Sequence, residues 1–153
     1  MPIEQRFTLV TLGVADVTAA TEFYRRLGWR QSTHSVDDTT FFTTPGPIIA
    51  LWSSAELAVD AGVATVTDAA PPAPPFRGVA LAINFDSRDE VDRALADWRA
   101  AGGRITKPAE ETEWGGYKGY GADLDGNLWE FAHNPFWPLD ERGMPQLDGG
   151  DVQ

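Results

Sequence analysis

The chain repeats one pattern of capping and apolar residues, and this repetition limits its fold more than any other feature. A β-rich run at residues 7–14 (FTLVTLGV) precedes Asp16, a residue type that favours the start of a helix. Apolar residues then recur at helical spacing until Gly28, at Ala20, Phe23, Tyr24 and Leu27. This stretch therefore predicts a strand followed by an amphipathic helix.

The same pattern returns in the second half of the chain. Residues 78–85 (GVALAINF) form a second β-rich run, and Ser87 with Glu90 makes a capping box. In the first half the apolar residues follow Asp16 at fixed distances along the sequence. The same distances counted from Ser87 give Val91, Ala94, Leu95 and Trp98. We infer a duplicated module.

Three strand signals follow each predicted helix. In the first half they are WRQSTHSV, TTFFTT and PIIALWS, at residues 29–36, 39–44 and 47–53. In the second half they are RITKPAE, GYKGYGAD and NLWEFAH, at residues 104–110, 116–123 and 127–133. We therefore predict an α+β fold in which two βαβββ modules form a curved mixed sheet around a cleft.

These signals also set the expected boundaries within one structural domain. The first module is expected at residues 1–61 and ends in a short helical segment (SSAELAVDAG), and the second is expected at residues 77–135. A Pro-rich connector at residues 62–76 separates them, and a loosely ordered tail is expected at residues 136–153.

Composition excludes several classes of function. The net charge of −11 disfavours nucleic acid, which needs cationic partners, but it suits a cationic small molecule. The absence of cysteine excludes disulfides, thiolate metal sites and a cysteine nucleophile. With no apolar run of about 18–20 residues and no signal-peptide core in MPIEQRF, we expect a cytoplasmic protein without a membrane partner. We also expect a homodimer, because two doubled modules bury more apolar surface when they pair.

Glu130 stands out because it occupies a strand between Trp129 and Phe131. Strand alternation sends those two aromatic residues into the core and Glu130 towards the cleft, at the position that Ala50 holds in the first module. A carboxylate in such a place needs water, a hydrogen bond or a ligand's positive group. The candidate donors are Thr11, Asn84, Tyr117, Lys118 and Tyr120.

The stretches TLGVADVTAATEFYRRLGW and WGGYKGYGADLDGNLWEFAHNP, within the doubled module order, resemble the vicinal oxygen chelate superfamily. That superfamily includes glyoxalase I, extradiol dioxygenases, fosfomycin-resistance enzymes and bleomycin-resistance proteins. The resemblance covers residues 5–140 and implies the fold given above, whereas one scaffold carries many chemistries. Leu124 stands where the family commonly has proline in this turn.

Metal-binding members of the family place ligands at cleft-facing positions of the first and last strand of each module. In this chain these positions are Leu9, Ala50, Ala80 and Glu130, and three of the four side chains have no donor atom. The resemblance therefore implies no tightly bound metal and no other cofactor. A divalent ion held by Glu130, a histidine and loop oxygens stays the alternative.

Two functions follow as expectations. The first is a protein that binds a small organic ligand, as bleomycin-resistance proteins do. The alternative is a lyase or isomerase of the glyoxalase or epimerase kind, or a dioxygenase, with Glu130 as catalytic metal ligand or general base. The residues expected to bind the ligand are Phe7, Leu9, Thr11, Ala50, Trp52, Ala80, Asn84, Trp114, Tyr117, Tyr120 and Glu130.

Overall fold

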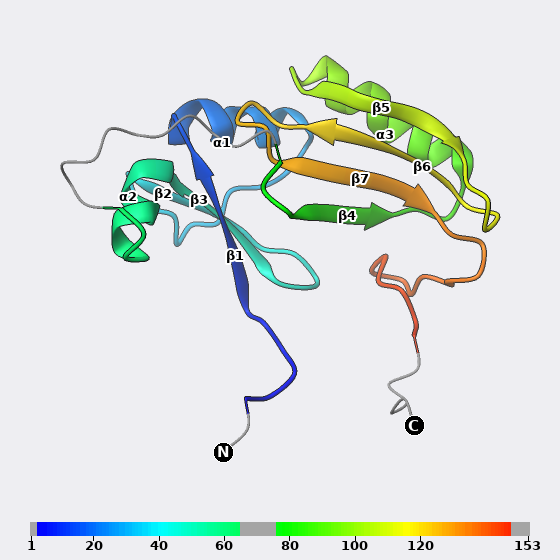
Figure 1. The fold of residues 1–153 in the computed structure, drawn as a ribbon, viewed down its shortest axis with the longest axis horizontal. Helices are drawn as coiled ribbons and strands as arrows, with labels where there is room; N and C mark the ends of the chain where they lie inside the picture. Colours follow the sequence, from blue (N-terminus) through cyan, green and yellow to red (C-terminus); the bar gives the residue numbers. More distant parts are fainter. Residues whose placement is uncertain (1–2, 65–75, 148–153) are drawn as a thin grey trace. The chain divides into compact units, whose positions relative to one another are not determined.

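The computed structural model describes residues 3–64 and 76–147, and these fall into two compact units divided between Gly78 and Val79. The expected α+β class is confirmed, with one three-stranded and one four-stranded mixed sheet and three helices in the described part of the chain (Figure 1). Most of the Pro-rich connector and the end of the tail lie outside the described residues, and the expected module boundaries stay a prediction.

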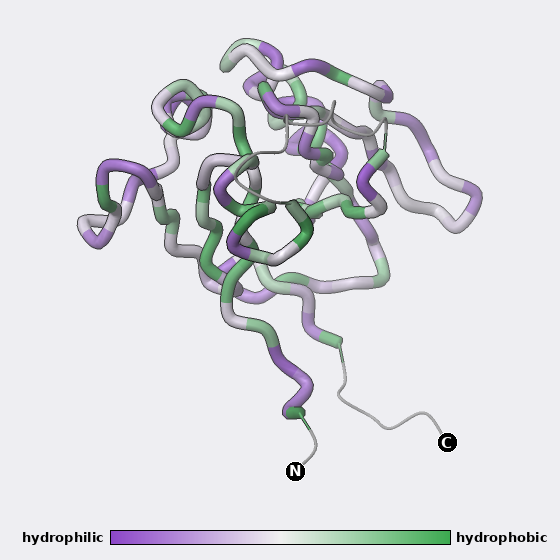
Figure 2. The backbone as a smooth tube through the Cα atoms, turned by 60° about the vertical axis from the view of Figure 1, so that its left-hand side comes forward, coloured by the Kyte–Doolittle hydropathy of each residue, from purple (hydrophilic) through white to green (hydrophobic). Residues whose placement is uncertain are grey.

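The first unit contains five elements. In chain order they are β1 (Leu9–Val14), α1 (Val17–Arg26), β2 (Thr39–Phe42), β3 (Ile48–Ser53) and α2 (Ser54–Asp60). The strand order is β1-β3-β2, with β1 parallel and β2 antiparallel to β3. In Figure 2 hydrophobic colour returns along β1 after the hydrophilic residues 4–6.

Local chemistry sets the bounds of α1 as the sequence predicts. The Asp16 carboxylate accepts a hydrogen bond from the Ala19 backbone N–H at 2.9 Å, which satisfies one of the free donors at the helix start. Of the expected apolar face, Ala20, Phe23 and Tyr24 are buried, whereas Leu27 is half-buried. Gly28 follows the helix at φ 91°, a conformation that a side chain would disfavour.

The strand expected at residues 29–36 does not form, and this prediction is wrong. Two isolated bridges, Gln31 to Phe42 and Val36 to Thr39, are all the pairing of this segment. Hydroxyl groups compete with the strand ladder here: the Phe41 N–H donates to Ser35 Oγ at 3.0 Å, and the His34 N–H donates to Ser32 Oγ at 3.1 Å. The first unit is therefore βαββ followed by α2.

The second unit has the full predicted set of elements. They are β4 (Ala80–Asn84), α3 (Arg88–Ala100), β5 (Arg104–Glu111), β6 (Tyr117–Ala122) and β7 (Leu128–His133). The strand order is β4-β7-β6-β5, and β4 is parallel to β7 whereas the other neighbours are antiparallel. The Ser87–Glu90 capping box is confirmed, with the Glu90 N–H donating to Ser87 Oγ at 3.2 Å.

Helix α3 packs closely on one face of this sheet because that face carries glycines. A Cβ on Gly119 would lie 2.8 Å from the Leu95 Cδ1 atom, and one on Gly121 would lie 2.5 Å from Trp98 Nε1. The Trp98 indole is 1% exposed and donates its N–H to the Ala122 carbonyl at 3.0 Å. Gly119 and Gly121 of GYKGYG thus serve helix packing.

The two units share the same strand register. Thr11 lies opposite Ala50 in the first unit, and Ala82 lies opposite Glu130 in the second. On the other side of these residues, Ala50 faces Phe41 and Glu130 faces Tyr120. The second unit therefore carries a tyrosine and a carboxylate where the first carries a phenylalanine and an alanine.

The units differ in what covers the sheet face opposite the long helix. In the first unit α2 packs against β1 and β3, and a Cβ on Gly13 would meet the Ser54 side chain. In the second unit residues 134–147 follow β7 without forming a helix. Among the described residues of the second unit, no helix therefore lies on the face of β7 that carries Glu130.

No helix among the described residues has the length and apolar character needed to cross a membrane.

Candidate functional site

Glu130 lies in the middle of β7 and takes part in a chain of polar contacts across two strands. The Tyr120 hydroxyl on β6 donates a hydrogen bond to Glu130 Oε2 at 2.7 Å. The Lys118 ammonium donates to the Tyr120 oxygen at 3.3 Å and lies 3.9 Å from the same Glu130 oxygen. Two of the five candidate donors, Lys118 and Tyr120, thus hold the carboxylate.

This cluster is half-buried. The Glu130 side chain is 24% exposed and the Lys118 side chain is 31% exposed, so water reaches both charges. A carboxylate with one hydrogen bond, one nearby cation and partial solvation carries no large burial cost. Glu130 is therefore accommodated by its surroundings.

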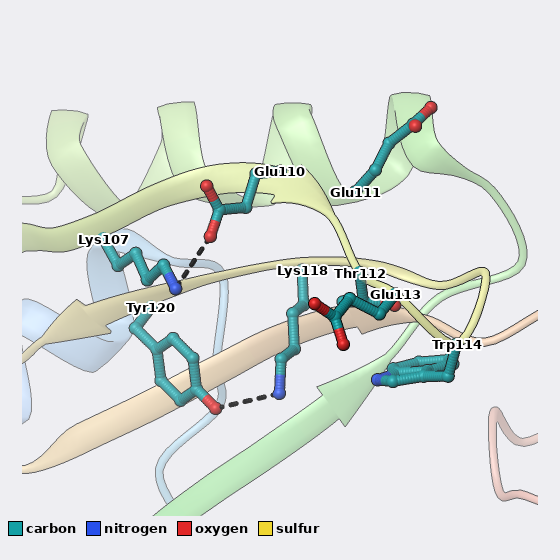
Figure 3. A pocket seen from close by; sticks show the side chains of 8 residues that line it. All are labelled: Lys107, Glu110, Glu111, Thr112, Glu113, Trp114, Lys118 and Tyr120. Atoms are coloured by element: carbon teal, nitrogen blue, oxygen red, sulfur yellow. Dashed lines mark hydrogen bonds and ion pairs between the residues drawn. The ribbon is translucent and has the colours of Figure 1, made fainter.

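A pocket of about 300 Å³ lies beside the cluster and shares Lys118 and Tyr120 with it (Figure 3). Its other walls come from the end of β5 and the turn into β6. An ion pair between Lys107 Nζ and Glu110 Oε1 at 2.7 Å borders it. The lining residues are Lys107, Glu110, Glu111, Thr112, Glu113, Trp114, Lys118 and Tyr120.

The expected site residues of the second unit divide between the two faces of its sheet. Ala80 and Asn84 lie on β4 at positions that alternate with Leu81 and Ile83, and they share the face of Ala82, which pairs with Glu130. Trp114 lies in the β5–β6 turn, 47% exposed, and lines the pocket.

Tyr117 does not share the face of Glu130, and that expectation is wrong. Its hydroxyl donates to Asp92 Oδ1 on α3 at 2.7 Å, and the Arg88 guanidinium lies 5.4 Å from the centre of its ring. The hydrogen bond to Asp92 is the main reason that the pKa of Tyr117 is raised. Tyr117 therefore belongs to the helix side of the sheet.

The remaining expected residues belong to the first unit. Phe7 precedes β1 and is 69% exposed, and Leu9 at the start of β1 is 38% exposed. Thr11 pairs with Ala50, which is buried. The indole N–H of Trp52 is buried without a hydrogen-bond partner in the described part of the chain. The cleft expected from the sequence stays a prediction.

Within residues 3–64 and 76–147, the side chains around Glu130 lack the donor set of a metal centre. Among the described residues, no three His, Cys, Asp or Glu side chains are grouped so that they could hold a metal ion. His133 contacts another group, with Nδ1 2.9 Å from the Phe85 carbonyl oxygen. His34 lies in a turn of the segment between α1 and β2. Glu130 has Tyr120 and Lys118 as neighbours, and a cation beside a carboxylate opposes metal binding.

Sequence reasoning missed the part of the pocket that β5 supplies. The register of β5 against β6 shifts between Ile105 and Lys107 and again between Lys107 and Glu110. Alternation along β5 therefore does not tell which side chains share the face of Glu130. Pro108, which cannot donate to a strand ladder, is the signal in the sequence that the pairing is interrupted there.

Comparison with known families gave a match over residues 6–131 to the model of the Glyoxalase/Bleomycin resistance protein/Dioxygenase superfamily. No curated protein sequence matched.

Solved structures are similar over most of the chain. A glyoxalase-related enzyme from Fulvimarina pelagi is 32% identical, with 94% of this chain and 99% of that chain covered and a TM-score of 0.79. A glyoxalase/bleomycin resistance protein/dioxygenase from Nocardioides is 27% identical, with 87% and 85% covered and a TM-score of 0.69. A lactoylglutathione lyase from Agrobacterium tumefaciens, 19% identical, shares the fold, with 90% and 100% covered and a TM-score of 0.62.

Proposed function

This chain belongs to the Glyoxalase/Bleomycin resistance protein/Dioxygenase superfamily, and we propose that it binds a small organic molecule at the Glu130 face of its second sheet. The observation that carries the proposal is the contact chain from Lys118 through Tyr120 to Glu130, two members of which line a pocket of about 300 Å³. That volume lies at the lower end of the range for ligand sites. The homodimer and the cytoplasmic location stay predictions.

Each of the three residues in this series of contacts has a distinct part in the proposed binding. Lys118 has three N–H donors and uses one on Tyr120, so the others are available to a ligand. Tyr120 presents its ring to the pocket while its hydroxyl is held by Glu130. Glu130 does not line the pocket and is a positioning residue that fixes the two side chains that do.

We expect Glu130→Gln to weaken ligand binding about tenfold while the fold stays intact. The glutamine oxygen can still accept from Tyr120, but the charge that holds Lys118 is lost. Because the carboxylate is partly solvated, its removal should change the free energy of unfolding by less than about 1 kcal/mol. Amide NMR shifts measured with a library of small soluble fragments would give both the site and the affinities.

Two further variants make this measurement specific. Glu141→Gln removes the same charge from an exposed residue that does not line the pocket, and it should leave fragment affinity unchanged. Tyr120→Phe removes the hydroxyl but keeps a ring that the first unit already has at Phe41. If the best fragments perturb amides away from Tyr120 and Glu130, or bind Glu130→Gln as well as the parent, the proposal is wrong.

We also propose that the protein works without a tightly held metal. The support is the donor set: at three of the four positions where the family resemblance implies metal ligands, this chain has Leu9, Ala50 and Ala80, which carry no donor atom. We expect elemental analysis of protein purified without chelator to find far less than one Zn, Ni, Mn or Fe per chain. About one tightly bound ion per chain would contradict this proposal.

An enzyme is the second candidate, and the Tyr120–Glu130 hydrogen bond favours it. General acid–base catalysis requires a positioned side chain that transfers a proton to or from the substrate, and a phenol held 2.7 Å from a carboxylate is a candidate for that part. The similar protein from Fulvimarina pelagi is described as a glyoxalase-related enzyme. A bound fragment that is chemically changed by the parent protein and not by Glu130→Gln would select this candidate.

A further inference from the structure

The charges around the pocket are paired except at one position. Lys107 is matched by Glu110 at 2.7 Å, and Lys118 lies 3.9 Å from Glu130. Glu111 is matched by an ion pair with Arg88. Each positive group that lines the pocket therefore already has a carboxylate of its own.

Glu113 is the exception. No ion pair or hydrogen bond of its carboxylate is found within residues 3–64 and 76–147, although it lines the pocket. It precedes Trp114, whose ring is 47% exposed, and Figure 3 shows both side chains at the same end of the pocket, near Lys118. The pocket thus combines one uncompensated negative charge with an accessible aromatic ring.

We propose that this pocket takes a small organic cation, an amine or amidine with a flat apolar part, and that Glu113 selects it. An uncompensated carboxylate attracts a cation, and the face of an indole ring attracts it further. The net charge of −11 acts in the same direction by favouring the approach of cations. The inference rests on the proposed function and adds the class of ligand to it.

An anionic ligand fits the same residues less well. Lys118 is the candidate to receive it through the N–H groups that Tyr120 leaves free, but the Glu130 carboxylate 3.9 Å away already offsets the charge of Lys118. A carboxylate bound there would also lie in the same pocket as Glu113, which would repel it. The balance of charges therefore favours the cation.

Three soluble probes of nearly equal shape test whether the pocket prefers a cationic ligand. They are benzamidinium, benzamide and benzoate, which are positive, neutral and negative at neutral pH. Affinities would be measured by amide NMR shifts on the full chain. We expect benzamidinium to bind at least tenfold more tightly than benzamide and benzoate to bind most weakly. Added salt should weaken benzamidinium binding and leave benzamide binding unchanged.

Substitutions test which side chains cause the preference for benzamidinium. In Glu113→Gln, benzamidinium and benzamide should bind within about twofold of each other, because the selecting charge is gone. Glu141→Gln, which removes the same charge elsewhere in the unit, should keep the full preference. Trp114→Ala should weaken both probes. Because the ring is 47% exposed, we expect the fold to stay intact, and the NMR spectrum itself would report its loss.

The outcomes separate this inference from the proposed function. If benzamide or benzoate binds as tightly as benzamidinium and shifts the Tyr120 and Lys118 amides, the cation preference is wrong and the binding site stands. A preference that survives in Glu113→Gln also contradicts the inference. If none of the three probes shifts the Lys118, Tyr120 or Glu130 amides, both the inference and the proposed site are wrong.

Discussion

Replacing Trp98 by alanine is expected to lower the free energy of unfolding by about 3–5 kcal/mol, the largest effect of any change considered for this protein. The indole is 1% exposed and lies with its ring centre 5.2 Å from that of Phe131 and 6.0 Å from that of Trp129. Its removal leaves a large cavity between α3 and the sheet and frees the Ala122 carbonyl of its hydrogen bond.

Chemical denaturation monitored by far-UV circular dichroism would measure this loss. Trp137→Ala is the matched control, because Trp137 is 42% exposed and its removal should change the free energy of unfolding by less than about 0.5 kcal/mol. Equal effects of the two substitutions would show that Trp98 does not anchor the second unit.

Gly121→Ala is expected to cost about 1–3 kcal/mol by crowding the same indole. The added Cβ would lie 2.5 Å from Trp98 Nε1 and 2.6 Å from Trp98 Cδ1, and both distances are too short to be accepted without movement. The ring has little room to move away, since a Cβ on Gly103 would also lie 2.3 Å from Nε1. The indole edge is thus confined between two backbone segments.

A double-mutant cycle tests this cause of the destabilisation. If Gly121→Ala acts through Trp98, it should cost much less in the Trp98→Ala background, because the atoms that it crowds are gone. Additive effects of the two substitutions, measured by the same denaturation experiment, would place the strain elsewhere.

Most of the fold was predictable because its signals are local and occur twice. Asp16 and Ser87 cap their helices through hydrogen bonds within three residues of sequence. The buried faces of α1 and α3 follow the helical period, and the strand pairs of β1 with β3 and of β4 with β7 repeat the same register. The segment at residues 29–36 failed because hydroxyl side chains there offer the backbone other partners.

The candidate site was predictable only in part. Glu130 and Tyr120 were expected on one face and are hydrogen-bonded. Tyr117 was expected with them, yet three positions separate it from Tyr120, and an odd spacing within one strand places two side chains on opposite faces. The contribution of Lys107 was hidden by the interrupted β5 pairing, which depends on contacts distant in sequence.

Helix α2 makes the two units differ in how freely the side chains on one sheet face can be replaced. In the first copy that helix packs on the sheet, so a larger side chain at Gly13 would disturb internal packing. The second copy forms no such helix in residues 134–147, and its strands carry the polar groups. The Glu130 face can thus change its side chains without disturbing a helix among the described residues of that unit. Directed evolution of a new ligand preference would therefore begin productively at β5, β6 and the turn between them.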